Sequence, residues 1–420
     1  MTSQIVNHVS ECFIKPPPNL QNHSNQPIHL TPFELLVLNI GYIQNGLLFA
    51  KPENQNFSIV VFLNNLQHAL SATLTHFYPL AARLATQKQE NPPSYVICID
   101  PKNSPGVKFI YATTTATIND ILTSTYLSPL VHSLFDLSDA INHDGHTLPL
   151  LSIQVTELID GVFVGVSLNH VVADGTTFWH FMATWSEIFM LTERDSYLIS
   201  RPPVYKRCDP IINLPFTHHE QFTQRLGPTN LLKERFFHFT SNSVSSLKAK
   251  ANAECNTTKI SSLQAVSALL WRCMTRARHL PHDAKTVCRI VINNRPRVDP
   301  PLLGWAALRL HEAENHNDSM VKSFVESWIK SPVIYQESGR FDPGVAHVSN
   351  SPKFDMYGCE FGLGKALAVR SGSTNKKDGR MIMYPGREGG GSMDVEVCLL
   401  PEYMVEFECD EELTSALKII

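Results

Sequence analysis

Apolar side chains recur with two different periods in the first half of the chain. Residues 58–76 place them at helical spacing, which predicts one amphipathic helix. Residues 152–159 and 162–169 instead indicate two strands, joined by Asp160-Gly161, a dipeptide that favours a tight hairpin turn. The second of these strands is apolar almost throughout, a pattern typical of a strand that is covered on both faces.

A short loop follows this second strand, and a helix follows the loop. The loop contains His170 and Asp174, with Gly175 directly behind them. From about Thr176 large apolar side chains line one broad stripe, which predicts a helix packed against a core. In α/β sheets ligands commonly bind beyond the carboxyl ends of strands and near helix N-termini, so this loop is a candidate site.

The second half of the chain shows another mixture of strands and helices. Residues 200–230 hold five prolines and no clear period, which is typical of a linker between domains. We therefore predict an α/β fold with two domains of similar size and a cleft between them. The predicted boundaries are 1–200 for the N-terminal domain, 201–230 for the crossover linker and 231–420 for the C-terminal domain. In the second half the pattern predicts strands at 236–240 and 286–294 and helices at 243–253 and 260–278, with the second strand buried.

The composition mainly excludes certain partners, targeting segments and cysteine sites. The chain has 420 residues, more than one typical core needs, which agrees with two domains. Its formal net charge of -4 argues against nucleic acid or an anionic membrane surface as the main partner. We expect neither a secretory signal nor a membrane-spanning segment, because the first residues lack the signal pattern and no apolar run is long enough. The nine cysteines form no Cys-x-x-Cys pair, so we expect no zinc site, no disulfide framework and a cytoplasmic location.

The spacing of His170 and Asp174 selects nothing by itself, because the pattern His-x-x-x-Asp occurs three times in the chain. Only this pair lies between a predicted buried strand and a predicted helix. From the residues alone, His170 is either a catalytic base or a buried, hydrogen-bonded structural histidine. The other two pairs are His132 with Asp136 and His279 with Asp283.

Several segments resemble the plant BAHD acyl-CoA-dependent acyltransferases, and they occur in the order of that family. The segment LNHVVADGTTFWHFM is similar to the family's His-x-x-x-Asp-Gly motif, and LTHFYPLAARL to its Tyr-Pro-Leu-Ala-Gly-Arg-Leu segment. The segment ISSLQAVSALLWRCMTRAR resembles the long helix of the family's second domain, and EFGLG its second signature. Within the family, the chain resembles uncharacterised acetyltransferases and the isochorismoyl-glutamate lyase-like members.

The resemblance implies a chloramphenicol acetyltransferase-like fold, with the active-site channel between two pseudo-equivalent mixed-sheet domains. It implies that His170 is the general base, which takes a proton from a hydroxyl or amine as that group attacks the thioester of an acyl-CoA, without an acyl-enzyme. An imidazole pKa of about 6.5 suits both the uptake and the return of that proton near neutrality. Asp174 would pair with Arg295 or Arg297, of which we favour Arg295, and Gly175 would relieve crowding at the turn.

Acyl-CoA is therefore expected as a co-substrate, with no permanently bound cofactor and no metal. Between residues 361 and 388 six basic residues stand against two acidic ones, which predicts a positive strip for the CoA phosphates. From this strip we select Lys365, Arg370 and Lys376 as CoA-channel residues. The second signature comprises Glu360, Phe361, Gly362 and Gly364, with Glu360 in place of the usual Asp and Leu363 in place of the usual Trp.

Two observations keep other functions open. Family members have a segment after the position of Leu302 that this chain lacks, so one alternative is an inactive acyltransferase-like protein. Another alternative is a lyase that acts on an isochorismate-type conjugate. The relative with that activity lacks the usual base, so the presence of His170 favours a transferase.

We expect a monomer whose partners are an acyl-CoA and a small alcohol or amine of plant specialised metabolism. The acyl donor and the acceptor depend on pocket side chains that a single sequence does not reveal.

Overall fold

The fold is described from a computed structural model, which covers residues 5–18, 26–52, 57–191, 199–205, 211–223, 232–281, 283–291, 317–335, 344–349 and 351–418. The first half contains β1 (Asn7–Ile14), β2 (Ile28–His29), α1 (Pro32–Leu36), β3 (Ile43–Ala50), α2 (Ile59–His76), η2 (Tyr78–Ala81), β4 (Arg83–Glu90), β5 (Pro93–Asp100), β6 (Val107–Thr113), α3 (Ile118–Leu122), α4 (Pro129–His132), η3 (Asn142–His146), β7 (Leu151–Glu157), β8 (Gly161–Leu168) and α5 (Gly175–Met190). The second half contains η4 (His219–Gln221), β9 (Lys233–Phe239), α6 (Ser241–Glu254), α7 (Ser262–Ala277), β10 (Val287–Ile290), α10 (Asn317–Lys330), β11 (Val345–Ser349), β12 (Ala368–Ser371), β13 (Arg380–Pro385), β14 (Met393–Leu399), α11 (Pro401–Glu408) and α12 (Glu411–Leu417).

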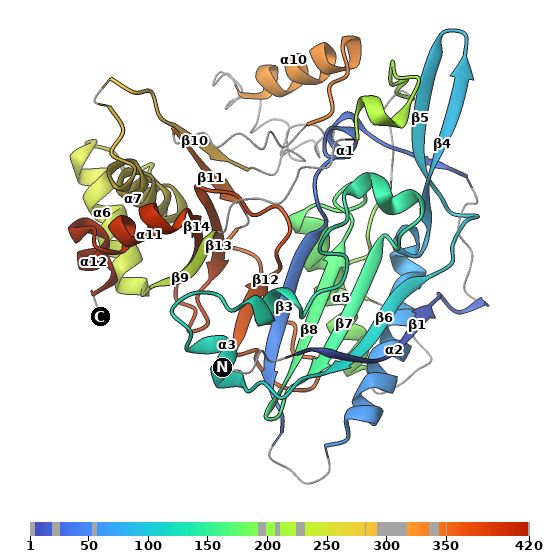
Figure 1. The fold of residues 1–420 in the computed structure, drawn as a ribbon, viewed down its shortest axis with the longest axis horizontal. Coiled ribbons are helices and arrows are strands. Elements are labelled where there is room, and N and C mark those ends of the chain that lie inside the picture. Colours follow the sequence, from blue (N-terminus) through green and yellow to red (C-terminus); the bar gives the residue numbers. More distant parts are fainter. Residues whose placement is uncertain are drawn as a thin grey trace.

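Two large mixed sheets organise the molecule, in agreement with the predicted α/β class. The first has the strand order β1-β6-β7-β8-β3-β12, and the second has the order β10-β11-β13-β14-β9. A smaller sheet, β2-β5-β4, extends from the first half. Helices α6, α7, α11 and α12 cover the outer side of the second sheet, whereas α2 and α5 pack on the first (Figure 1). Among the described residues, none of the helices combines the length and apolar character that crossing a membrane requires.

The predicted strand–loop–helix unit of the first half is confirmed. Strand β8 is buried along its whole length and pairs antiparallel with β7 on one side and β3 on the other. The hairpin connection comprises residues 158–160, so the turn lies one residue earlier than the predicted Asp160-Gly161, and Gly161 is already the first residue of β8. Helix α2 matches the predicted range closely, and its apolar stripe packs against α5 in the first core.

The last part of the chain returns to the first sheet. Strand β12 pairs antiparallel with β3, at the edge of the six-stranded sheet (Figure 1). The segment before β12 also contributes Met356, Cys359 and Phe361 to the core that α2 and α5 share with that sheet. The predicted domain boundaries stay predictions, but the segment from 356 to 371 packs with the N-terminal half although it follows residue 231.

The prediction of a buried strand over 286–294 is wrong in its burial. Strand β10 occupies Val287–Ile290 at the edge of the second sheet, and its side chains are mostly exposed. An edge strand has a neighbour on one side only, so apolar residues do not guarantee that it is covered. Residues 292–294 of the predicted strand lie outside the described residues.

Candidate active site

His170 lies in the loop that leaves β8, and buried asparagines hold its backbone. The backbone N–H of His170 donates to Oδ1 of Asn142, 2.7 Å away. Asn169, the residue before it, donates from Nδ2 to the backbone oxygen of Asn142 at 2.8 Å and accepts from the N–H of Val171 at 3.1 Å. Both asparagines are fully buried. These hydrogen bonds fix the backbone of the loop relative to β8.

The environment of the imidazole favours its neutral form. Burial lowers the pKa of His170, and the positive charge of Arg380 acts in the same direction. The backbone of His170 and Ala173 and the carboxylate of Asp174 oppose this shift without reversing it. Within the described part of the chain, the buried Nδ1 has no hydrogen-bond partner. A neutral imidazole is the form that can accept a proton.

Asp174 turns the loop into the next helix. Its Oδ1 accepts from the backbone N–H of Thr177 at 2.9 Å, which makes Asp174 the N-cap of α5. The proposed partners Arg295 and Arg297 lie outside the described residues, so the predicted ion pair stays a prediction. An aspartate at this position satisfies one of the first helical N–H groups and so stabilises the start of α5.

Gly175 does not relieve crowding, contrary to the prediction. A Cβ built there would meet only the ring of Phe354, at 3.4 Å, which is ordinary van der Waals contact. The backbone of Gly175 is also helical, so no left-handed conformation demands glycine. A methyl group is therefore sterically permitted at this position.

The second signature packs against the core of the first sheet. Phe361 is fully buried and lies edge-on to Trp185, with ring centroids 4.7 Å apart. Its backbone N–H donates to Ser186 Oγ at 3.2 Å, which ties the segment to α5. Gly362 and Gly364 have φ values of 70° and 77°, a region that favours glycine. Glu360 points to the surface beside this turn.

Lys376 does not line an open CoA channel, contrary to the prediction. It is 9% exposed, and its Nζ lies 3.1 Å from Oε2 of Glu234 and is in direct contact with Glu396, which has no exposure. Nζ also donates to Ser371 Oγ at 2.7 Å. Glu234, Glu396 and Cys398 are close enough together to ligate a metal ion, but the ammonium of Lys376 already pairs with both carboxylates. Sequence reasoning saw the lysine but not the carboxylates that β9 and β14 bring to it.

The other two candidates for the CoA channel differ in how exposed they are. Arg370 is 9% exposed, and its guanidinium lies over the ring of Phe236 with a centroid distance of 4.2 Å. It therefore does not stand on an open basic strip, and this part of the prediction is wrong. Lys365 is exposed, as a contact to CoA would require.

The histidines of the other two His-x-x-x-Asp pairs lie at the ends of helices. His132 ends α4, and its Nε2 lies 3.3 Å from Glu234 on β9. His279 follows α7 with a φ of 46° and is exposed. Of these three histidines, only His170 directly follows a buried strand. Asn142 was missed by the sequence reasoning, since nothing in its neighbourhood marks it, whereas Asn169 could have been noticed directly before the histidine.

Comparisons with known proteins identify the family of the chain. The model described as the Transferase family matches residues 5–304 and 302–414. An uncharacterised acetyltransferase of Arabidopsis thaliana is 33% identical over 97% of this chain and 98% of its own. The BAHD acyltransferase DCR of the same plant is 31% identical over 88% of this chain and 85% of its own.

Solved structures share the fold at low identity. Vinorine synthase has a TM-score of 0.72 and 19% identity, with 98% of both chains covered. TRI101 of F. graminearum, complexed with ethyl coenzyme A, has a TM-score of 0.69 and 16% identity over 93% of this chain and 98% of its own. The predicted fold class is thereby confirmed.

Proposed function

This chain belongs to the Transferase family of BAHD acyltransferases, and from that premise we propose that it transfers an acyl group from an acyl-CoA to a hydroxyl or amine of a small plant metabolite. The observation that carries the proposal is His170, a neutral imidazole held at the end of β8 by two buried asparagines. The complex of the fold neighbour TRI101 with ethyl coenzyme A supports CoA as the donor's carrier.

His170 is the general base in this proposal. It removes a proton from the acceptor as the acceptor's oxygen or nitrogen attacks the thioester carbonyl. The tetrahedral intermediate then collapses, the carbon–sulfur bond breaks, and the imidazolium returns its proton to the departing thiolate of CoA. No acyl-enzyme forms, so the rate depends on holding both substrates together beside the histidine.

The experiment is thiol release from a panel of acyl-CoA donors with a pooled plant metabolite extract, with products identified by mass spectrometry. The test variant is His170→Asn, and the matched control is His279→Asn, because His279 is an exposed histidine of another His-x-x-x-Asp pair. Asparagine also tolerates the positive φ at that control position. We expect His170→Asn to fold normally and lose turnover, and His279→Asn to keep it. Retained turnover in His170→Asn would remove His170 from the role of base.

The same assay separates the alternatives. A lyase would consume its substrate without CoA, and an inactive relative would give neither turnover nor a thermal shift with any acyl-CoA. Cytoplasmic location and a monomeric state complete the proposal as expectations from the sequence. Size-exclusion chromatography with light scattering tests the monomeric state.

A further inference from the structure

Three histidines meet where the crossover segment, residues 211–223, touches the first half of the molecule. His143 and His146 lie in η3, and His219 lies in η4. The ring centroid of His143 lies 4.5 Å from that of His146 and 4.7 Å from that of His219. Nε2 of His143 and Nδ1 of His219 are 2.8 Å apart, so one imidazole donates a hydrogen bond to the other. We call His143, His146 and His219 the histidine cluster.

The cluster is one of the points that hold the crossover segment against the first half. The segment lies beside β5 (Figure 1), where Leu214 and Tyr95 exchange two backbone hydrogen bonds of 2.8 and 2.9 Å. Phe222 is 1% exposed, and its ring packs at 5.6 Å against the rings of both His143 and His219. The segment is therefore anchored on both sides of His219.

The other side of the cluster leads directly to the proposed base. Asn142, the neighbour of His143 in η3, accepts a hydrogen bond from the backbone N–H of His170 at 2.7 Å. The backbone N–H of His143 is already paired with the oxygen of Leu38 at 2.8 Å, so the crossover segment holds η3 through the imidazole of His143. A displacement of His143 is passed through one peptide unit to the residue that fixes the His170 backbone.

The hydrogen bond between His143 and His219 tolerates only one extra proton. Two neutral rings, or one neutral and one charged ring, leave a lone pair to which an N–H can donate. When both rings are protonated, two N–H groups face each other and the hydrogen bond is lost. The two positive charges also repel each other at this short distance. The state of protonation therefore decides whether the crossover segment stays tied to η3.

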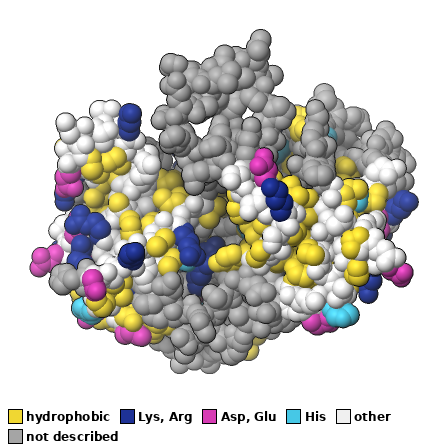
Figure 2. All heavy atoms as spheres, turned by 90° about the horizontal axis from the view of Figure 1, so that it is seen from above, with side chains coloured by type: hydrophobic (Ala, Val, Ile, Leu, Met, Phe, Trp, Pro, Cys, Tyr) yellow, Lys and Arg dark blue, Asp and Glu magenta, His cyan; other side chains and the backbone are white. Residues whose placement is uncertain are grey.

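The surroundings of the cluster resist a second positive charge. Titratable side chains face the cluster from four elements, and they are Lys88 of β4, Tyr95 of β5, Asp144 of η3 and Glu220 of η4. All three rings are half-buried, and the described surface seen from above shows only isolated histidines (Figure 2). Burial lowers the pKa of His219, which Glu220 opposes and Lys88 reinforces. Burial also lowers the pKa of His146, and a positive charge on His219 adds to this effect.

The balance of protons gives the direction of the pH dependence. An imidazole that has left the cluster titrates near its ordinary pKa of 6.5, whereas His219 within the cluster has a lower pKa. The released state binds more protons, so the attachment is complete above pH 6.5 and weakens as the pH falls below that value. Because His143 and His219 share a hydrogen bond, they titrate as a pair and not one ring at a time.

We propose that the hydrogen bond between His143 and His219 positions the His170 loop for catalysis, and that a second proton on this pair releases the loop, so that turnover falls steeply in acid. This inference rests on the proposed function, because it concerns the same base. His143 and His219 are positioning residues, which act on His170 through Asn142. The crossover segment thereby makes the geometry of the site depend on pH.

Amide side chains separate the hydrogen bond from the charge. An amide offers both a donor and an acceptor but does not titrate, so the double variant His143→Gln/His219→Asn keeps a hydrogen bond between two neutral side chains. His219→Leu removes the hydrogen bond and keeps an apolar side chain against Phe222. The matched control is His218→Asn, because His218 is exposed, lies next to His219, and bonds Gln221 through its backbone N–H.

Turnover of the full-length protein is measured from about pH 5 to about pH 8, with the acyl-CoA that performs best in the donor panel and its acceptor. At about pH 7.5, His219→Leu should lower kcat about tenfold with little change in KM, whereas the double variant and His218→Asn should stay within about twofold of the parent. Below about pH 6, log kcat of the parent should fall with a slope above about one, because the base and the pair each take up a proton. In the double variant only the base titrates, so its slope should not exceed about one.

Hydrogen exchange followed by mass spectrometry gives a second readout, which needs no turnover. The backbone N–H of His170 exchanges only when its hydrogen bond to Asn142 opens. At about pH 7.5, His219→Leu should speed exchange in the peptide that contains His170, and the double variant should not. At about pH 5.5, the parent should exchange faster in this peptide than the double variant.

Each outcome decides the inference. Unchanged kcat and unchanged exchange in His219→Leu overturn it, even if that variant melts at a lower temperature, because the pair would then be merely structural. An equal acid slope in the parent and the double variant also overturns it, and so does a double variant that is as slow as His219→Leu. If no acceptor is turned over by the parent, the proposed function fails, whereas the difference in exchange still supports or overturns the role of the pair.

Discussion

Replacing Lys376 by Met tests whether this lysine is a structural cation or a CoA contact. The substitution keeps most of the side-chain volume but removes the ammonium. Nζ lies 3.1 Å from Glu234 and contacts Glu396, and both glutamates are buried. Removing one partner of a buried ion pair typically costs about 3–5 kcal/mol, because the remaining charge is left without compensation. Here two carboxylates lose their cation, so we expect a loss of free energy of unfolding in that range at pH 7.5.

The pH dependence gives the sign of the effect. The Lys376 ammonium overcomes the opposing effect of burial and lowers the pKa of Glu234 to about 2, from an ordinary value of 4.5. A carboxylate with a lowered folded-state pKa stabilises the protein fully above its unfolded-state pKa, and that stability is lost as the pH falls through the folded-state value. In Lys376→Met the ammonium is absent, so the protein loses the stabilisation that comes from the lowered pKa of Glu234. The difference in stability between parent and variant should therefore be largest above pH 4.5 and should narrow below it.

Urea unfolding at several pH values measures the difference, and Lys365→Met is the matched control. Lys365 is exposed, so its loss should cost less than about 1 kcal/mol. The reasoning is refuted if the two variants are equally stable. An increased KM for acyl-CoA in a fully stable Lys376→Met protein would reinstate the CoA-channel role that the sequence suggested.

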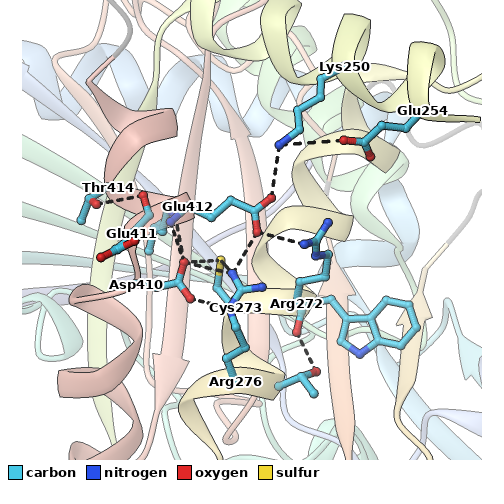
Figure 3. Close-up of polar contacts among 12 residues, drawn as sticks. Lys250, Glu254, Arg272, Cys273, Arg276, Asp410, Glu411, Glu412 and Thr414 are labelled. Carbon is cyan, nitrogen blue, oxygen red and sulfur yellow. Dashed lines mark hydrogen bonds and ion pairs between the residues drawn. The ribbon is translucent and has the colours of Figure 1, made fainter.

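Three further substitutions test the site and its supports. Asn142→Ala removes the acceptor of the His170 backbone N–H. The base is then misplaced, so kcat should fall up to about 100-fold with only a small change in KM. An unchanged kcat would contradict this positioning role of Asn142. Phe361→Ala should cost about 3–5 kcal/mol in a thermal or urea melt, because it empties a fully buried site against Trp185, and a loss below 1 kcal/mol would show that this core can collapse. Asp410→Ala removes the N-cap of α12 and the 2.7 Å contact to Arg276 Nε (Figure 3), which should cost about 1–3 kcal/mol above pH 3.8. Burial raises the pKa of Asp410, but hydrogen bonds from Arg276 and Leu413 outweigh it and lower this pKa to about 2. The difference in stability between parent and Asp410→Ala should therefore fade as the pH falls towards that value. A difference that does not change with pH would refute this explanation.

The local parts of the fold were predictable from the sequence. Helix α2, the β7–β8 hairpin and helix α5 follow from the spacing of apolar residues, because that spacing reflects which face of one element is buried. The position of His170 between strand and helix follows from the same pattern. The burial of β10 was not predictable in this way, since the neighbours of a strand depend on sheet order and not on the strand's own residues.

The sequence by itself determined the family, the order of the main elements and the histidine on which the proposed chemistry depends, since these reside in contiguous segments. The tertiary structure decided which charges meet. It placed Lys376 between two carboxylates from distant strands. It also brought Asn142 to the His170 loop and β12 to the first sheet. The physical reason is that a charge or hydrogen bond acts over a few ångströms of space, so its effect is set by which strands become neighbours and not by position along the chain.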